Sequence, residues 1–221
     1  MEERVLSADK LAVGLMSYVV LLFSLSVHES AHAWTAVKQG DPTAQSLGRI
    51  TLNPLAHIDI IGTVVMPLLM IFTGVPLLGW AKPTPVDPRY FRNLRVGQIV
   101  VSAAGPVSNL LLALLGTAGL FVAVRALPGP LRDHPLVVLL SMVVQLNVLL
   151  AIFNMVPLPP LDGSHIVEWA LPNGMGHRYV RAIAPYGGLI LLALVMSGAL
   201  WTVLGPVHEA IVALLYSLVR R

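Results

Sequence analysis

The chain has 221 residues, of which 56% are hydrophobic and only 11% charged, a balance that excludes an ordinary soluble domain and predicts a polytopic membrane protein. It contains no cysteine, which excludes disulfides and thiolate metal sites, so any metal would be held by imidazole and carboxylate groups. The formal net charge of +3 is interpreted as basic loops that set membrane topology, not as a nucleic-acid surface.

Several apolar segments reach the roughly 20 residues that a helix needs to cross a bilayer. They lie at about 11–38, 98–126, 136–157 and 183–204, and a shorter fifth lies at 206–219. No secretory signal is expected, because the N-terminus mixes acidic with basic residues. The polar interruptions are short, so we predict an all-α polytopic membrane protein with about five transmembrane helices and a single membrane-embedded domain over residues 1–221.

The first apolar segment contains the sequence His-Glu-Ser-Ala-His at positions 28–32. Residues four apart share one helical face, so His28 and His32 can bind one metal ion with Glu29 beside it, as in zinc hydrolases. An ionisable residue in the bilayer costs on the order of 2.5 to 3.5 kcal/mol, which favours a functional explanation. The alternative is that the three side chains only make interhelical hydrogen bonds.

The loop that follows has a turn signal at Gly40-Asp41-Pro42 and β character from Gly48 to Asn53. We predict a short β-like loop at about 43–55. Irregular backbone at membrane depth is tolerated only against protein or a wet cavity, so this loop should border the metal site.

A second candidate ligand follows three prolines in the stretch 154–165. Pro157, Pro159 and Pro160 break the helix, which directs Asp162 into the interior, where it can complete a His-His-Asp site with one position open for water. The alternatives are that Asp162 caps the next helix or that His165 is the third ligand.

Parity of the membrane crossings predicts that segment 58–78, which glycines and prolines interrupt, is re-entrant. A full crossing would leave His32 and Asp162 on opposite membrane faces. Re-entry places ten of the 14 Lys and Arg residues on the face of the metal site, if the tail with Arg220 and Arg221 is counted there. By the positive-inside rule this face is cytoplasmic and the N-terminus lies outside.

Four further residues are candidates for binding substrate or stabilising an oxyanion. Asn154 and Asn109 are amides in apolar segments, and His57 and Asn53 occupy the polar loop. Structural hydrogen bonding is the alternative for Asn154, Asn109 and His57.

Five stretches together resemble the site-2 protease family of intramembrane zinc metalloproteases, in its compact prokaryotic form. They are HESAH, GRITLNPLAHIDIIGT, GWAKPTPV, SAAGPVSN and NMVPLPPLDG. The resemblance implies one Zn²⁺ held by His28, His32 and Asp162, with Glu29 as the general base. It also implies location in the cell membrane and cleavage of a transmembrane protein near the cytoplasmic face, with Gly48–Asn53 receiving the substrate as an added strand.

Two features depart from many relatives. Ser164 stands where they have a second glycine after the LDG motif, and no PDZ or CBS domain interrupts the sequence. The first departure is expected to be minor, and the second removes the usual clues to regulation.

The leading functional hypothesis is an intramembrane zinc endopeptidase whose partners are a transmembrane substrate and the lipid bilayer. One alternative is a divalent-metal transporter that uses the His and Asp cluster as a passage site. Transport predicts polar groups on both sides of the site, whereas here they gather in one cluster. Another alternative is a catalytically silent scaffold. The sequence carries no signal for an oligomeric state.

Overall fold

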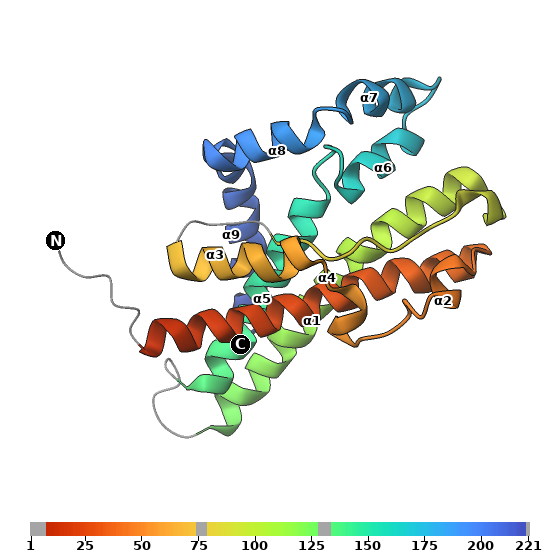
Figure 1. Ribbon diagram of the computed structural model, residues 1–221. Helices are drawn as coiled ribbons and strands as arrows, with labels where there is room; N and C mark the ends of the chain where they lie inside the picture. The colour runs from red at the N-terminus through yellow and green to blue at the C-terminus, as the bar shows by residue number, and fades with distance from the viewer. Residues whose placement is uncertain (1–7, 74–78, 128–133, 220–221) are drawn as a thin grey trace.

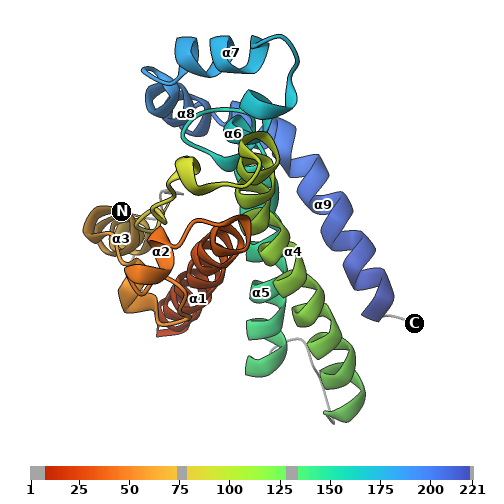
Figure 2. The same ribbon diagram turned by 90° about the vertical axis from the view of Figure 1, so that its right-hand side faces the viewer.

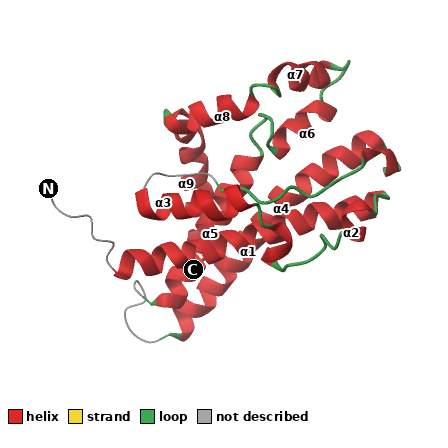
Figure 3. Cartoon of the chain, viewed as in Figure 1, coloured by secondary structure: helices red, strands yellow, loops and turns green. Residues whose placement is uncertain are grey.

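The computed structural model describes residues 8–73, 79–127 and 134–219, which form helices and loops without a strand (Figure 3). The helices are α1 (Ala8–Gln39), α2 (Thr43–Ser46), α3 (Met66–Thr73), α4 (Leu94–Ala126), α5 (Pro135–Asn154), α6 (Asp162–Ala170), α7 (Met175–Ile183), α8 (Gly187–Met196) and α9 (Ala199–Val219). Shorter helical turns cover Pro54–His57, Ile60–Val65 and Pro88–Tyr90. The expected all-α class is confirmed.

Side-chain caps explain where several helices begin. Asn93 accepts a hydrogen bond from the backbone N–H of Val96 at the start of α4, at 3.0 Å. The imidazole of His134 accepts one from Leu136 at the start of α5, where Pro135 occupies the first helical position. Caps of this kind satisfy backbone donors that the helix itself leaves free.

Four helices, α1, α4, α5 and α9, are long and apolar enough to cross a membrane, and the bent pair α7 and α8 raises the number to five if it counts as one span. Helix α4 is central, since it contacts α1, α5, α6 and α9. The buried side chains that join α4, α5 and α9 are Ala113, Leu120, Val144, Val148 and Leu215. Helices α6, α7 and α8 lie at one end of this bundle (Figures 1 and 2).

The expected boundaries of the last two apolar segments, 183–204 and 206–219, are wrong. Helix α8 ends before Gly198, whose φ of +74° is a left-handed conformation that glycine adopts without steric cost. Helix α9 then starts at Ala199 and continues through Pro206 to Val219. The proline is accommodated within the helix, as is common in membrane-spanning helices.

Helix α9 ends on the side where α4 also ends, because Nη1 of Arg125 donates to the carbonyl of Val219 at 3.5 Å. The sequence-based prediction had counted the C-terminal tail on the opposite face. Arg220 and Arg221 themselves lie outside the described residues.

The chain on the two sides of the expected re-entrant segment 58–78 lies close together. The N–H of Lys82 donates to the carbonyl of His57 at 2.8 Å, and that of Trp80 to Gly62 at 3.3 Å. Between these bonds the apolar helical stretch Ile60–Leu69 is too short to span a bilayer. Residues 74–78 lie outside the described residues. Because Trp80 and Lys82 pair with the start of the segment, the chain returns to the place from which it left, as the re-entrant prediction requires.

The expected β-like loop at about 43–55 is wrong in its local structure. Residues 43–46 form α2, and the backbone from Gly48 to Asn53 is irregular, with no partner strand among the described residues. Hydrogen bonds from a side chain, and not a β-ladder, fix the position of this loop. The guanidinium of Arg49 donates to the carbonyls of Ala56, Lys82 and Pro83, which fastens the loop to the chain beyond the re-entrant segment.

Candidate metal centre

Three side chains that are far apart in sequence meet at the end of the bundle where α1 and α5 finish and α4 begins. His28 and His32 come from α1, and Asp162 is the first residue of α6. One nitrogen or oxygen of each lies within 4.8 Å of those of the other two. The Nε2 atoms of the histidines are 3.0 Å apart, and they lie 3.2 and 3.4 Å from the Asp162 carboxylate.

A buried hydrogen-bond chain orients His28. Its Nδ1 lies 2.6 Å from Oδ1 of Asn109, which can only accept, so Nδ1 carries a proton and, in the neutral ring, Nε2 presents its lone pair to the cluster. The amide of Asn109 donates to Asn147 at 2.8 Å, and the amide of Asn147 donates to Ser24 at 2.9 Å. This chain fixes both the tautomer and the ring plane of His28.

His32 is oriented in the same way by a backbone group. Its Nδ1 lies 2.7 Å from the carbonyl of Val101, in the first turns of α4. A carbonyl only accepts, so Nδ1 carries a proton and, in the neutral ring that binds metal, the Nε2 lone pair of His32 also points into the cluster. Two imidazole lone pairs and a carboxylate therefore converge from α1 and α6.

The cluster fits a zinc ion. Two donor atoms on one tetrahedral zinc ion lie roughly 3.3 Å apart, close to the spacing of the two Nε2 atoms. Oδ2 of Asp162 is buried and has no hydrogen-bond partner among the described residues. Such a buried acceptor is costly unless a cation satisfies it, and two imidazoles with one carboxylate form a typical zinc donor set.

The alternative roles considered for Asp162 and His165 are not seen. Helix α6 has Leu161 at its N-cap and no side-chain cap hydrogen bond, so the Asp162 carboxylate does not cap the helix. The side chain of His165 is 49% exposed and lies 3.6 Å from Glu168. Within the described ranges, the only set of side chains that could hold a metal is His28, His32 and Asp162.

Glu29 is half-buried beside the two histidines, and Thr84 holds it. The N–H and hydroxyl of Thr84 both donate to Oε2 of Glu29, at 2.8 and 2.7 Å. Oε1 accepts no hydrogen bond from any described residue. The carboxylate thus has one anchored oxygen and one that is available for a water molecule.

The four residues that were candidates for substrate or oxyanion binding all make hydrogen bonds within the protein. The amide of Asn109 is used within the chain that orients His28, and that of Asn154 donates to Leu150 of its own helix at 2.9 Å. Asn53 caps the turn Pro54–His57. His57 is buried and its Nε2 contacts the carbonyl of Thr51 at 2.9 Å. Substrate or oxyanion roles for these residues stay predictions.

Sequence reasoning missed the residues that support the ligands. Ser24 and Asn147 carry a detectable signal, because each is a polar residue within a predicted membrane span. Thr84 carries none, since it becomes relevant only when the segment after the re-entrant stretch returns to α1. Gly105 carries none either, because its role depends on the distance between α1 and α4.

Replacing Gly105 by alanine is expected to abolish zinc binding. A Cβ at this position would lie 2.4 Å from Nε2 of His32 and 2.5 Å from Nε2 of His28, in the space that the ion would take. The measurement is zinc content per purified chain. The control is Gly188→Ala in α8, where a Cβ meets nothing within 4 Å. Full zinc content in both variants would contradict the site.

Comparison with known proteins points to one family. Residues 121–196 match the model of Peptidase family M50. The chain is 39% identical over 211 residues to YwhC of Bacillus subtilis, covering 91% of this chain and 92% of that protein. It is 32% identical over 197 residues to Rip2 of Mycolicibacterium smegmatis, covering 85% and 70%. It is 26% identical over 205 residues to sll0528 of Synechocystis, covering 87% and 44%.

Each of these three relatives is named "Putative zinc metalloprotease". No solved structure gives a significant match. The similarity to YwhC extends over nearly the whole of both chains, so it includes the segment from His28 to Asp162.

Proposed function

Because this chain belongs to Peptidase family M50, the site-2 protease family, and is a zinc metalloprotease of that type, we propose that it is an intramembrane endopeptidase. It cleaves a transmembrane segment of another membrane protein, and Glu29 is its general base. The observation that carries this proposal is the position of the cluster. Two imidazoles, one carboxylate and an anchored second carboxylate meet inside a bundle of membrane-spanning helices.

His28, His32 and Asp162 would hold the zinc ion. The chemistry that zinc supplies in such a site is the activation of water and the polarisation of a carbonyl group. Thr84 keeps Oε2 of Glu29 in place, so that Oε1 accepts the proton of the attacking water and later returns it to the leaving amine. Asn109 and Val101 keep the two imidazoles in the tautomer that binds metal.

The loop Gly48–Asn53 would receive the substrate in extended form. The carbonyl of Thr51 accepts hydrogen bonds from Ser30 and from His57, so the loop is fastened to α1 directly beside Glu29. The neighbouring side chains of Ile50 and Leu52 are exposed. A helical substrate hides its peptide bonds, and pairing with this loop would expose one to the site.

The polar residues next to the metal cluster argue against a metal transporter. A chain of polar side chains leads away from the cluster, but its members are buried and bonded to one another; they are Ser24, Asn109 and Asn147. Because these side chains are committed to one another, they are not free to coordinate a passing ion.

We further propose that the metal site faces the cytoplasm. The N–H of Arg92 donates to the carbonyl of Gln39 at the end of α1, so this basic stretch lies on the side of the metal centre. If Arg220 and Arg221 are counted with the end of α9, on the opposite side, the side of the metal centre still has more Lys and Arg residues than the other side. The positive-inside rule therefore gives the same orientation.

A reporter inserted next to Arg92 is therefore expected to give a cytoplasmic signal, and one placed after Ala126, at the far end of α4, an external signal. Activity of two reporters that function on opposite sides of the membrane measures both positions. Exchange of the two signals would overturn the orientation.

The proposed function is tested by comparing membrane proteins from cells that make the wild-type chain with those from cells that make the Glu29→Gln variant. We expect at least one membrane protein to be shortened only with the wild-type chain, with the new end inside its transmembrane segment. Identical protein patterns under conditions where both chains are present would contradict an endopeptidase.

A further inference from the structure

Helix α9 carries an ionisable residue where a membrane helix normally has none. Glu209 is the middle residue of α9, which is apolar enough to span the bilayer. Its side chain is exposed on the outer surface of the bundle, and it forms no hydrogen bond or ion pair with any described residue. Ionisable residues within spanning helices usually face the bundle interior and pair with another group, so an exposed carboxylate at this depth lacks its partner.

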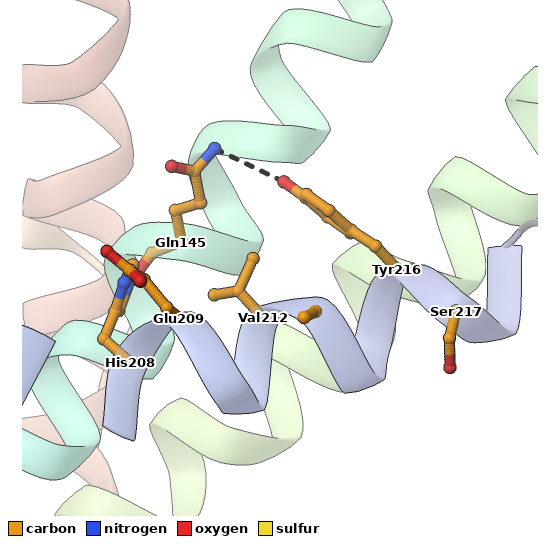
Figure 4. Close-up of a pocket in the computed structure, with 7 residues that line it drawn as sticks. Gln145, His208, Glu209, Val212, Tyr216 and Ser217 are labelled. Atoms are coloured by element: carbon orange, nitrogen blue, oxygen red, sulfur yellow. Dashed lines mark hydrogen bonds between the residues drawn. The ribbon is translucent and has the colours of Figure 1, made fainter. Parts of the chain in front are cut away.

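A groove of about 370 Å³ lies between α5 and α9 beside this residue. Figure 4 shows the side chain of Gln145 from α5 and those of His208, Glu209 and Tyr216 from α9 around it. Nε2 of His208 donates to the carbonyl of Gln145 at 3.0 Å, and the amide of Gln145 donates to the hydroxyl of Tyr216 at 3.3 Å. These bonds hold three polar side chains in place without using the carboxylate.

The few polar atoms in the groove are mostly hydrogen-bond acceptors. No described residue donates to the Glu209 carboxylate or to the amide oxygen of Gln145, and Nδ1 of a neutral His208 is left as an acceptor because Nε2 carries the proton. The remaining donors are the hydroxyl of Tyr216 and the second amide N–H of Gln145. The complementary ligand therefore brings donors and positive charge.

We propose that this groove binds a transmembrane helix of another membrane protein that carries a lysine or arginine near the middle of its span. A basic side chain would pair with Glu209 inside the bilayer, where both charges are costly alone. Ala213 and Ser217, which also line the groove, are small enough to let a second helix approach closely.

A second copy of this chain does not suit the groove. Both copies insert into the membrane in the same orientation, so a symmetric contact along α9 would bring two Glu209 carboxylates to the same depth. Like charges repel, and neither copy has a lysine or arginine between Ala199 and Val219 to compensate. The partner is therefore a different protein. The proposal does not depend on the metal centre, which α1, α4 and α6 build.

Cross-linking tests the proposal with defined probes. The full chain with Ala213→Cys is placed in phosphatidylcholine nanodiscs, where the new thiol is unique because the natural chain has no cysteine. The probes are leucine-alanine helices of about 20 residues that carry one cysteine and differ only at the central residue, which is lysine, leucine or glutamate. Disulfide formation after mild oxidation is measured.

We expect the lysine helix to cross-link about tenfold more than the leucine helix, in line with the strength of polar contacts between membrane helices, and the glutamate helix least. Glu209→Gln should reduce the lysine helix to the level of the leucine helix, and unchanged elution in size-exclusion chromatography checks that this variant is folded. The control places the cysteine at Leu115, which is 68% exposed on α4, where all three helices should react equally.

Three results would overturn the proposal. One is equal cross-linking of the lysine and leucine helices at the groove. Another is no effect of Glu209→Gln on the lysine helix. The third is a disulfide between two copies of the chain that forms as efficiently without any probe, which would assign this face to a second copy.

Discussion

Glu29→Gln is expected to leave the zinc content of the chain unchanged and to reduce peptide-bond cleavage by roughly 10² to 10⁴-fold, the contribution of a well-placed general base. Glutamine has the shape of glutamate and its amide oxygen still accepts from Thr84, which now donates to Oε2 at 2.7 and 2.8 Å. The amide cannot take a proton from water. Metal binding and catalysis should therefore separate in this variant.

The measurement is zinc content together with the cleavage rate of a reconstituted membrane substrate. Glu168→Gln is the matched control, because it removes a carboxylate from α6 that contacts only His165 among the charged groups of the described chain. It should keep both zinc and activity. Cleavage by Glu29→Gln at the wild-type rate would exclude Glu29 as the base, while loss of zinc would assign it to the metal ligands.

Asp162→Ala is expected to lose zinc and, with it, all cleavage. Loss of a supporting hydrogen bond to a metal ligand typically costs 10 to 100-fold in affinity, so loss of the ligand itself should cost more than about 100-fold. The two histidines that remain are both on α1. The Asp162 carboxylate is the group of α6 that contacts them, and the variant lacks it. Zinc titration of the purified chain measures the affinity.

His165→Ala separates this site from the competing assignment. His165 lies one turn beyond Asp162 on α6 but is half exposed and outside the cluster. It should bind zinc as tightly as the wild-type chain. If His165→Ala loses the metal and Asp162→Ala keeps it, the third ligand has been assigned wrongly.

Much of the site could be predicted because its candidate metal ligands lie in short sequence motifs. The helical spacing of His28 and His32 places both rings on one face whatever the rest of the chain does. The prolines before Asp162 end α5 and free the carboxylate from a regular helix face. Parity of the crossings then required 58–78 to return on itself, and the bonds of His57 with Lys82 and of Gly62 with Trp80 agree.

The local errors have equally physical causes. β propensity in Gly48–Asn53 produced no strand, because a strand needs a partner and the carbonyls that Arg49 binds belong to the helical turn Pro54–His57 and to irregular chain. The apolar segments 183–204 and 206–219 place the break between the last helices at residue 205. The chain instead breaks at Gly198, which has a left-handed conformation, and Pro206 is tolerated within the spanning helix.

By itself, the sequence determined the class of the protein, the side chains that could hold a metal and the reaction that their types favour, because hydropathy and helical spacing act over short stretches. Only the tertiary structure decided what surrounds these residues. Asn109 comes from α4, Thr84 follows the re-entrant segment, and Gly105 must lack a side chain because α4 packs so closely on the two rings. The groove at Glu209 likewise exists only because α5 and α9 pack together. Such contacts depend on distances between helices, which no local pattern contains.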